Sequence, residues 1–109
     1  MKWQIEFYNE TVKNETHSFP KKILAKLLHI FDLIEEFGHK LGKPYIDSFG
    51  DGLFEIRAKG QEGIGRSLFC YMSDKRIVIL HSFAKKSQKT PKKELQIALK
   101  RKKELENEK

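Results

Sequence analysis

Basic side chains and one histidine gather in the second half of the chain, on a run of short predicted strands. Glu55, Arg57 and Lys59 occupy alternate positions of the first of these strands, so all three side chains point to one face. If the following strands pair with it as hairpins, further basic residues reach that face near one end of the sheet. The candidate set is Arg57, Lys59, Arg66, His81, Lys85, Lys86 and Lys89. Strand register decides whether they meet, and the sequence does not fix register.

Such a set has the chemistry needed to cut RNA without a metal ion. The 2′-hydroxyl of the substrate attacks the neighbouring phosphate, and the phosphorane then gathers negative charge. Arginine forks match phosphate oxygens, and cations aimed at developing charge stabilise it. Histidine is the natural proton carrier near neutral pH, and crowding by other cations lowers a lysine's pKa so that it can act as a base. Aromatic neighbours could stack an unpaired base.

Each candidate also has a structural interpretation. Glu55 could be an ion-pair partner for basic residues nearby, and His81 could be a hydrogen-bonded core histidine at the end of an apolar run. The lysines could be solvated strand ends, and lysines on edge strands also protect sheets from aggregation. The aromatic residues among them, Phe54, Phe69 and Phe83, are typical core side chains. The residue pattern alone therefore leaves a catalytic site and a structural cluster both open.

Charge is distributed unevenly along the chain of 109 residues. Residues 75–109 contain 12 Lys and Arg but 4 Asp and Glu, whereas residues 1–74 contain 10 against 11. The formal net charge of +7 therefore comes from the last third of the chain. A concentrated cationic surface attracts polyanions, with nucleic acid the first candidate and an anionic membrane the second. A solvated helix face is the alternative interpretation.

Periodicity predicts the strands that would position these residues. Alternating apolar residues favour strands over 3–7, 53–59, 64–72 and 76–83, joined by short turns that imply hairpins. The run 77–80 is apolar on both faces and predicts a central strand. Residues 9–18 are expected to form a short helix or a loop, and residues 38–52 a loop.

Two helices complete the predicted order β-α-β-β-β-α. The first runs from Pro20 to Phe37, with Ser18 as its cap and Gly38 at its end. Its apolar stripe consists of Ile23, Leu24, Leu27, Leu28, Phe31, Ile34 and Phe37. The second starts with Thr90 as cap and Pro91 in the first turn, and carries the cationic run 100–103. Its thinner stripe consists of Leu95, Ala98, Leu99 and Leu105. The order indicates one α+β domain over residues 1–109, with a twisted antiparallel sheet packed against a long helix.

Several classes of protein are excluded by what the sequence lacks. It contains no P-loop, no dinucleotide-binding glycine pattern, no HExxH motif and no zinc-like spacing of Cys and His. Cys70 is the only cysteine, so no intrachain disulfide can form, which fits a reducing compartment. The first residues lack the apolar run of a signal peptide, and no stretch approaches the roughly 20 apolar residues of a membrane span. We expect a soluble, cytoplasmic protein with no metal or cofactor.

Over Leu53–Pro91 the sequence resembles the RelE/ParE superfamily of toxins, and within it the phage-derived HigB-type branch. Three segments carry the resemblance: LFEIR at 53–57, RSLFCY at 66–71 and RIVILHSFAKKSQKTP at 76–91. The third is similar to the branch signature H-x-F-x-K-K-[ST]-x-K-T-P and is the most specific. The predicted order of elements agrees as well, so the resemblance covers essentially the whole chain.

The resemblance implies a RelE-like α+β fold, in which a small twisted, antiparallel-rich sheet packs on N-terminal helices and a C-terminal helix follows. It implies the toxin of a type II toxin–antitoxin system, a metal-independent endoribonuclease that cuts messenger RNA on the ribosome. It also implies a helix-turn-helix antitoxin partner, HigA-like in type. By this resemblance the catalytic candidates are Arg66, His81, Lys85 and Lys86. The expected RNA-binding residues are Arg57, Lys59 and Lys89.

The sequence departs from part of the superfamily, because no tyrosine follows Tyr71 to match the C-terminal tyrosine of some RelE-type members. The general base and the general acid therefore stay open. Two other functions also stay open. A ParE-type toxin that inhibits DNA gyrase could share the fold, and a noncatalytic RNA-binding module could use the same cations without chemistry.

Overall fold

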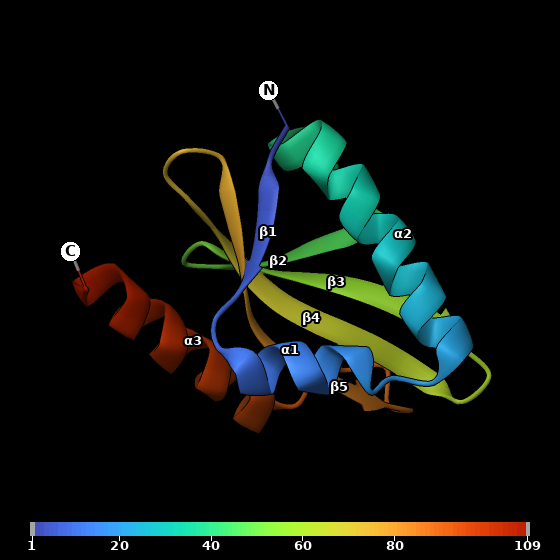
Figure 1. The fold of residues 1–109 in the computed structure, drawn as a ribbon. Coiled ribbons are helices and arrows are strands. Elements are labelled where there is room, and N and C mark those ends of the chain that lie inside the picture. Colours follow the sequence, from blue (N-terminus) through green and yellow to red (C-terminus); the bar gives the residue numbers. More distant parts are fainter. Residues whose placement is uncertain (1, 109) are drawn as a thin grey trace.

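The structure is a computed structural model that describes residues 2–108. It contains five strands, three α-helices and a short 3-10 helix (Figure 1). In chain order the elements are β1 (Gln4–Phe7), α1 (Glu10–His17), α2 (Lys21–Phe37), η1 (Gly38–Lys40), β2 (Ile46–Gly50), β3 (Leu53–Gly60), β4 (Gly63–Met72), β5 (Arg76–Lys85) and α3 (Lys92–Asn107). The predicted α+β class is confirmed.

The strands form one sheet in the order β1-β5-β4-β3-β2. The pairs β2–β3, β3–β4 and β4–β5 are antiparallel, whereas β1 runs parallel to β5. Connections of two or three residues join β3, β4 and β5, as the turn residues predicted. The strand β5 is an interior strand, as its two-sided apolar run indicated, although the middle position belongs to β4.

Helices cover both faces of the sheet (Figure 1). On one face α1 and α2 bury a large core with side chains from β3, β4 and β5. The helix α3 packs on the other face against β4 and β5, over a smaller core. That smaller core consists of Leu53, Leu68, Cys70, Val78, Leu80 and Ala98. Both faces of the sheet are therefore shielded from solvent by helices. The basic residues lie on the α3 face, at the end of the sheet that α3 does not cover.

Two details of the predicted helix stripes are wrong. In α2, Leu28 and Phe37 are 39% and 50% exposed, and Ile30 is buried instead, because the helix presents a narrower face to the sheet than the full stripe. In α3, Leu99 is 39% exposed while Ala98 is fully buried. The small side chain of Ala98 lets α3 approach the sheet closely, so Leu99 is turned outward.

The predicted helix caps also differ from the structure. Ser18 ends α1 rather than starting α2, and its hydroxyl donates to the Glu15 carbonyl at 2.7 Å. Proline residues occupy the N-cap positions of α2 and α3 without side-chain cap bonds. Thr90, expected to cap α3, uses its hydroxyl on the buried carboxylate of Glu55 instead. A tertiary contact therefore replaces the local cap.

The strand β2 lies inside the segment predicted as a loop. It is an edge strand of five residues that pairs with β3, and its register shifts between Ser48 and Gly50. Breakers such as Gly42 and Pro44 precede it, and its short irregular pattern gave no strand signal. Among the described residues, no helix is long and apolar enough to cross a membrane.

Candidate functional site

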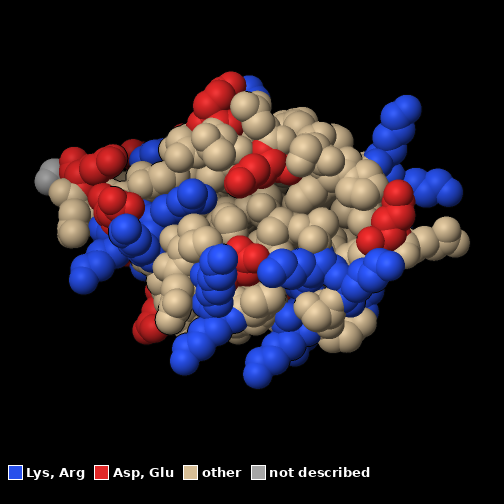
Figure 2. Space-filling view, turned by 90° about the horizontal axis from the view of Figure 1, so that it is seen from below, with Lys and Arg blue, Asp and Glu red and all other residues tan. Residues whose placement is uncertain are grey.

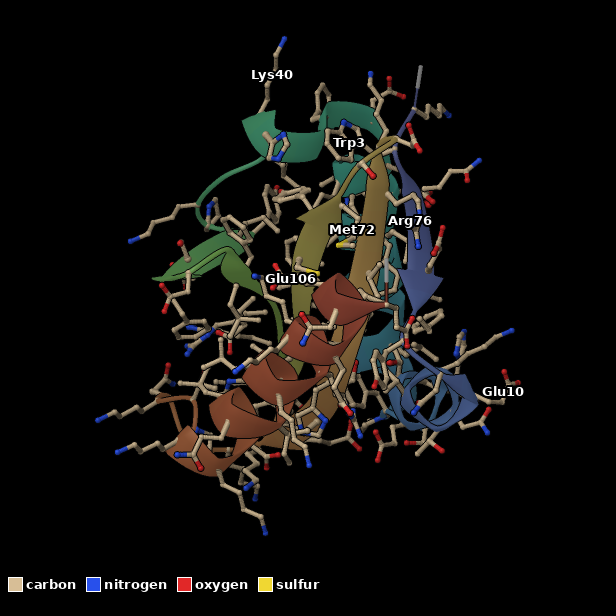
Figure 3. All side chains as sticks on the ribbon, turned by 90° about the vertical axis from the view of Figure 1, so that its left-hand side faces the viewer. Trp3, Glu10, Lys40, Met72, Arg76 and Glu106 are labelled. Atoms are coloured by element: carbon tan, nitrogen blue, oxygen red, sulfur yellow. The ribbon has the colours of Figure 1, made fainter. Side chains whose placement is uncertain are left out.

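The register of β3, β4 and β5 gathers the predicted residues on one face, at the end of the sheet that α3 leaves open. Residues that face each other across the three strands form three rows. The rows are Glu55–Leu68–His81, Arg57–Arg66–Phe83 and Lys59–Ile64–Lys85. Figure 3 shows α3 lying across this side of the sheet. The strand register, which the sequence could not fix, therefore brings these side chains together on one face.

A β-bulge in β5 positions the histidine. Leu68 pairs with His81, but the next residue of β4, Phe69, pairs with Ile79, so β5 carries one extra residue at Leu80. A bulge of this kind lets two successive side chains point to the same face. Leu80 packs in the α3 core, and His81 contacts α3 directly.

The first cluster is built around the carboxylate of Glu55, which is fully buried. Arg57 Nε donates to Glu55 Oε1 at 2.6 Å, and the Thr90 hydroxyl donates to Oε2. Arg57 Nη2 also donates to the Thr90 hydroxyl oxygen, at 3.3 Å. Arg66 Nε lies 3.8 Å from Glu55 Oε2. One carboxylate thus balances two guanidinium groups.

Arg66 is the largest fully buried side chain of the described residues. Its guanidinium is held by backbone carbonyls of the segment that follows β5: Nη2 donates to Ser87 and, at 3.1 Å, to Gln88, and Nη1 reaches the Lys85 carbonyl at 3.5 Å. Its Nε has no hydrogen-bond partner. Residues 85–88 therefore cover Arg66 with acceptors of the kind that a phosphate would also present.

Electrostatics at this cluster favour binding of an anion. Burial lowers the pKa of the Arg66 guanidinium, the neighbouring charge of Arg57 lowers it further, and Glu55 opposes both. Two cations against one carboxylate leave an excess positive charge in a place with little water. A phosphate that replaced the covering carbonyls would supply the missing negative charge, and arginine's fork suits that exchange.

The second cluster joins β5 to the first turn of α3. His81 Nε2 lies 2.6 Å from Glu94 Oε1, and Lys85 Nζ lies 3.0 Å from Glu94 Oε2. Burial raises the pKa of Glu94, but the hydrogen bonds and charges of His81 and Lys85 outweigh it, so the net pKa lies below the usual value. Glu94 is therefore ionised at neutral pH.

The ionised carboxylate fixes the role of each nitrogen of His81. A carboxylate only accepts hydrogen bonds, so Nε2 must carry a proton toward Glu94. The opposite nitrogen, Nδ1, is buried and has no hydrogen-bond partner. In the neutral ring Nδ1 then holds a free lone pair, which is the property that a general base needs.

Phe83 lies between the two clusters. The Arg66 guanidinium carbon is 5.6 Å and Lys85 Nζ 6.0 Å from its ring centre, and the His81 ring stacks against it at 5.5 Å. The ring of Phe83 is only partly buried. One aromatic side chain therefore contacts the three residues that the sequence put forward for catalysis on β4 and β5.

The structure thus brings together Arg57, Arg66, His81 and Lys85. Lys59 lies at the exposed end of the same face, and Lys86 and Lys89 are exposed on the segment before α3. Sequence reasoning missed two partners, because it assigned Thr90 only as a helix cap and did not single out Glu94. Which of these residues carry chemistry stays a prediction. Within residues 2–108, no group of three or more His, Cys, Asp or Glu could hold a metal ion.

The cationic run in α3 is partly structural. Arg101 donates to the Leu80 carbonyl at 2.7 Å and lies over the Tyr8 ring, and Lys102 pairs with Glu106 at 2.6 Å. Figure 2 shows lysines and arginines projecting mainly along the lower half of that view, with acidic residues mostly above and to the left. The uneven distribution of charge along the sequence therefore corresponds to an uneven distribution of charge on the surface.

Comparisons with known proteins place this fold. The family described as phage derived protein Gp49-like matches residues 14–103. A chain in the crystal structure of the archaeal RelE–RelB complex from Pyrococcus horikoshii OT3 is similar in fold, with a TM-score of 0.54 and 22% sequence identity. The match covers 77% of this chain and 96% of that chain. A comparison with curated proteins gave no match.

Proposed function

The chain belongs to the phage-derived Gp49-like family, and from that membership, the RelE-like fold and the cationic face we propose that it is a HigB-type toxin that cuts messenger RNA on the ribosome. One observation carries the proposal: Arg57, Arg66, His81 and Lys85 converge from three strands on one face. A metal-independent ribonuclease needs phosphate-binding cations and a proton carrier side by side, and this face supplies both.

The proposed reaction is transfer of the phosphoryl group within the RNA. The 2′-oxygen attacks the adjacent phosphorus as it gives its proton to His81 Nδ1, the P–O5′ bond breaks, and a 2′,3′-cyclic phosphate and a 5′-hydroxyl are formed. Arg66 and Arg57 hold the phosphate oxygens, and Lys85 or Lys86 stabilises the added charge of the phosphorane. The proton that the 5′-oxygen needs comes from one of these cations or from water. Lys59 and Lys89 contact neighbouring phosphates.

The proposal requires the covering segment to move. Arg66 is fully buried, with backbone carbonyls instead of solvent around its guanidinium, and His81 is 7% exposed. RNA on the ribosome would displace residues 85–88 from Arg66, exchanging neutral carbonyl acceptors for charged phosphate oxygens. The guanidinium would then pair with an acceptor of opposite charge, in the bidentate geometry that suits arginine and phosphate, which favours the exchange.

The proposed partners follow from the same membership. We expect a HigA-like helix-turn-helix antitoxin, in keeping with the antitoxin-bound state named for the archaeal RelE–RelB structure. The toxin would act in the cytoplasm, where translated messages are found. No cofactor enters the proposed reaction.

Induction in a bacterial host tests the proposal. We expect growth to stop and translated messages to become shorter, whereas His81→Gln and the double variant Lys85→Gln/Lys86→Gln should abolish both effects. Arg66→Lys keeps the charge but loses the fork, so it should reduce cleavage strongly without leaving an unpaired Glu55. The exposed histidine of α1 provides a matched control, His17→Gln, which should leave activity unchanged.

Two outcomes would favour a function other than messenger RNA cleavage. Full growth arrest with intact messages and a DNA-damage response would favour a gyrase inhibitor. RNA binding that falls steeply with salt, without cleavage under any condition, would favour a noncatalytic RNA-binding module. Circular dichroism of each purified variant shows that a loss of activity is not a loss of folding.

A further inference from the structure

A hollow lies at the edge of β3, between α2 and the residues around the start of β2. This edge pocket has a volume of about 690 Å³, inside the range of roughly 300–1,000 Å³ found for small-ligand sites. Ile30 and Ala58, 6% and 2% exposed, form part of its wall, and the ring of Tyr45 is 37% exposed beside them. The pocket therefore offers an apolar surface and two accessible rings, those of Tyr45 and the exposed His29.

Cations line the edge pocket more than anions do. Lys26, Arg57 and Lys59 contribute to its lining, and Lys26 Nζ donates to the Lys59 carbonyl at 2.6 Å. Asp47 also lines the pocket, but its carboxylate lies 3.8 Å from Lys43 Nζ. An anionic ligand with a flat apolar part is the chemistry that this combination suits.

Two further hollows continue from the edge pocket around the turn between β3 and β4. One shares Lys59 with it, the other shares Lys26, and both reach Gly60 and Gln61. The lysines that line the three hollows together are Lys21, Lys22, Lys26, Lys59 and Lys86. Five lysines along adjoining hollows favour a chain of phosphates over a single anion.

Arg57 connects the edge pocket to the candidate active site. Arg57 is one of the residues that line the pocket, its backbone N–H donates to the Tyr45 carbonyl, and its guanidinium donates to Glu55 and Thr90. Lys86, which lines one of the neighbouring hollows, belongs to the segment that covers Arg66. A nucleic-acid strand bound at Arg66 would therefore reach these hollows over a short length of its backbone.

We propose that the edge pocket binds an unpaired base of single-stranded RNA, stacked on Tyr45, while the lysine-lined hollows hold the phosphates of the flanking nucleotides. The choice of RNA rests on the proposed function, because the strand would be the message that the candidate active site cuts. Base stacking on an aromatic ring tolerates any sequence, and the cations follow the backbone. The pocket would thus fix the path of the strand rather than its sequence.

Binding of a labelled 2′-O-methyl oligonucleotide of about eight nucleotides, which cannot be cleaved, tests the proposal by fluorescence anisotropy. Tyr45→Ala should weaken binding by about tenfold, and Tyr45→Phe should restore most of it. Lys59→Gln and Lys26→Gln should each reduce the slope of log affinity against log salt by about 0.7. The controls are Phe37→Ala, which removes another exposed ring, and Lys40→Gln, which removes an exposed lysine of η1 that lines none of the three hollows (Figure 3).

The measurement separates the two proposals. Equal affinity of the wild type, Tyr45→Ala and Lys59→Gln would overturn the edge pocket as an RNA site, whether or not the protein cleaves messages. Tyr45-dependent binding by a protein that never cleaves would support the pocket and contradict the nuclease. Binding of an oligoglutamate peptide, but not of RNA, at Tyr45 would show an acidic protein segment as the occupant and overturn the proposal.

Discussion

Neutralising Glu55 should destabilise the fold far more than a typical charge removal. In Glu55→Gln the side chain keeps its shape and its amide oxygen can still accept from Thr90. The guanidinium of Arg66, fully buried, loses its only carboxylate within 4 Å among the described residues. Removing one partner of a buried ion pair costs about 3–5 kcal/mol, because the other charge is left uncompensated. We expect about 3 kcal/mol, since Arg57 is partly exposed and can turn to water.

Urea unfolding followed by circular dichroism measures this loss in the free energy of unfolding. The double variant Glu55→Gln/Arg66→Met removes both buried charges, so it should recover much of the loss. Glu10→Gln, an exposed carboxylate in α1, is the matched control and should change stability by less than about 0.5 kcal/mol. A loss below about 1 kcal/mol in Glu55→Gln would show that the cluster is hydrated, and the electrostatic account of Arg66 would be wrong.

Three further predictions concern other parts of the molecule. The pKa of Glu94 lies below its usual 4.5, so the stability contributed by the ionised carboxylate is present above that pH and is lost as the pH falls through the lower native pKa. Between about pH 5 and about pH 3, the free energy of unfolding should therefore fall less in Glu94→Gln than in the wild type. Burial raises the pKa of Cys70 to about 11, so a thiol reagent at neutral pH should label it only after unfolding, and rapid native labelling would contradict its burial. A methyl group on Gly65 would lie 2.5 Å from Ile23, so Gly65→Ala should lower the melting temperature through a cost of about 1–3 kcal/mol; an unchanged melting temperature would show that α2 shifts freely.

Regular periodicity made most of the fold predictable. The helix α2 and the hairpins β3–β4–β5 follow apolar patterns whose periods leave little choice. The strand β2 was missed because pairing with β3, a tertiary contact, stabilises a segment whose local pattern is that of a loop. The cap assigned to Thr90 failed for a related reason, since a buried carboxylate from another strand competes for its hydroxyl.

The candidate site was predictable in its residues and not in its arrangement. Alternation placed Arg57 on the face of Glu55, but the bulge at Leu80 that turns His81 toward α3 leaves no mark in the sequence. Glu94 could not be found either, because its role depends on how the start of α3 docks against β5. The burial of Arg66 depends on the return of residues 85–88 over the sheet, which no local pattern encodes.

Cleavage of a defined message by the purified protein, with and without translating ribosomes, tests the central claim most directly. The account predicts cuts only on the ribosome, with a 5′-hydroxyl on one product and a 2′,3′-cyclic phosphate on the other, and loss of both in His81→Gln. An intact message on translating ribosomes, or equal cleavage by wild type and His81→Gln, would contradict the claim that this cationic face cuts RNA.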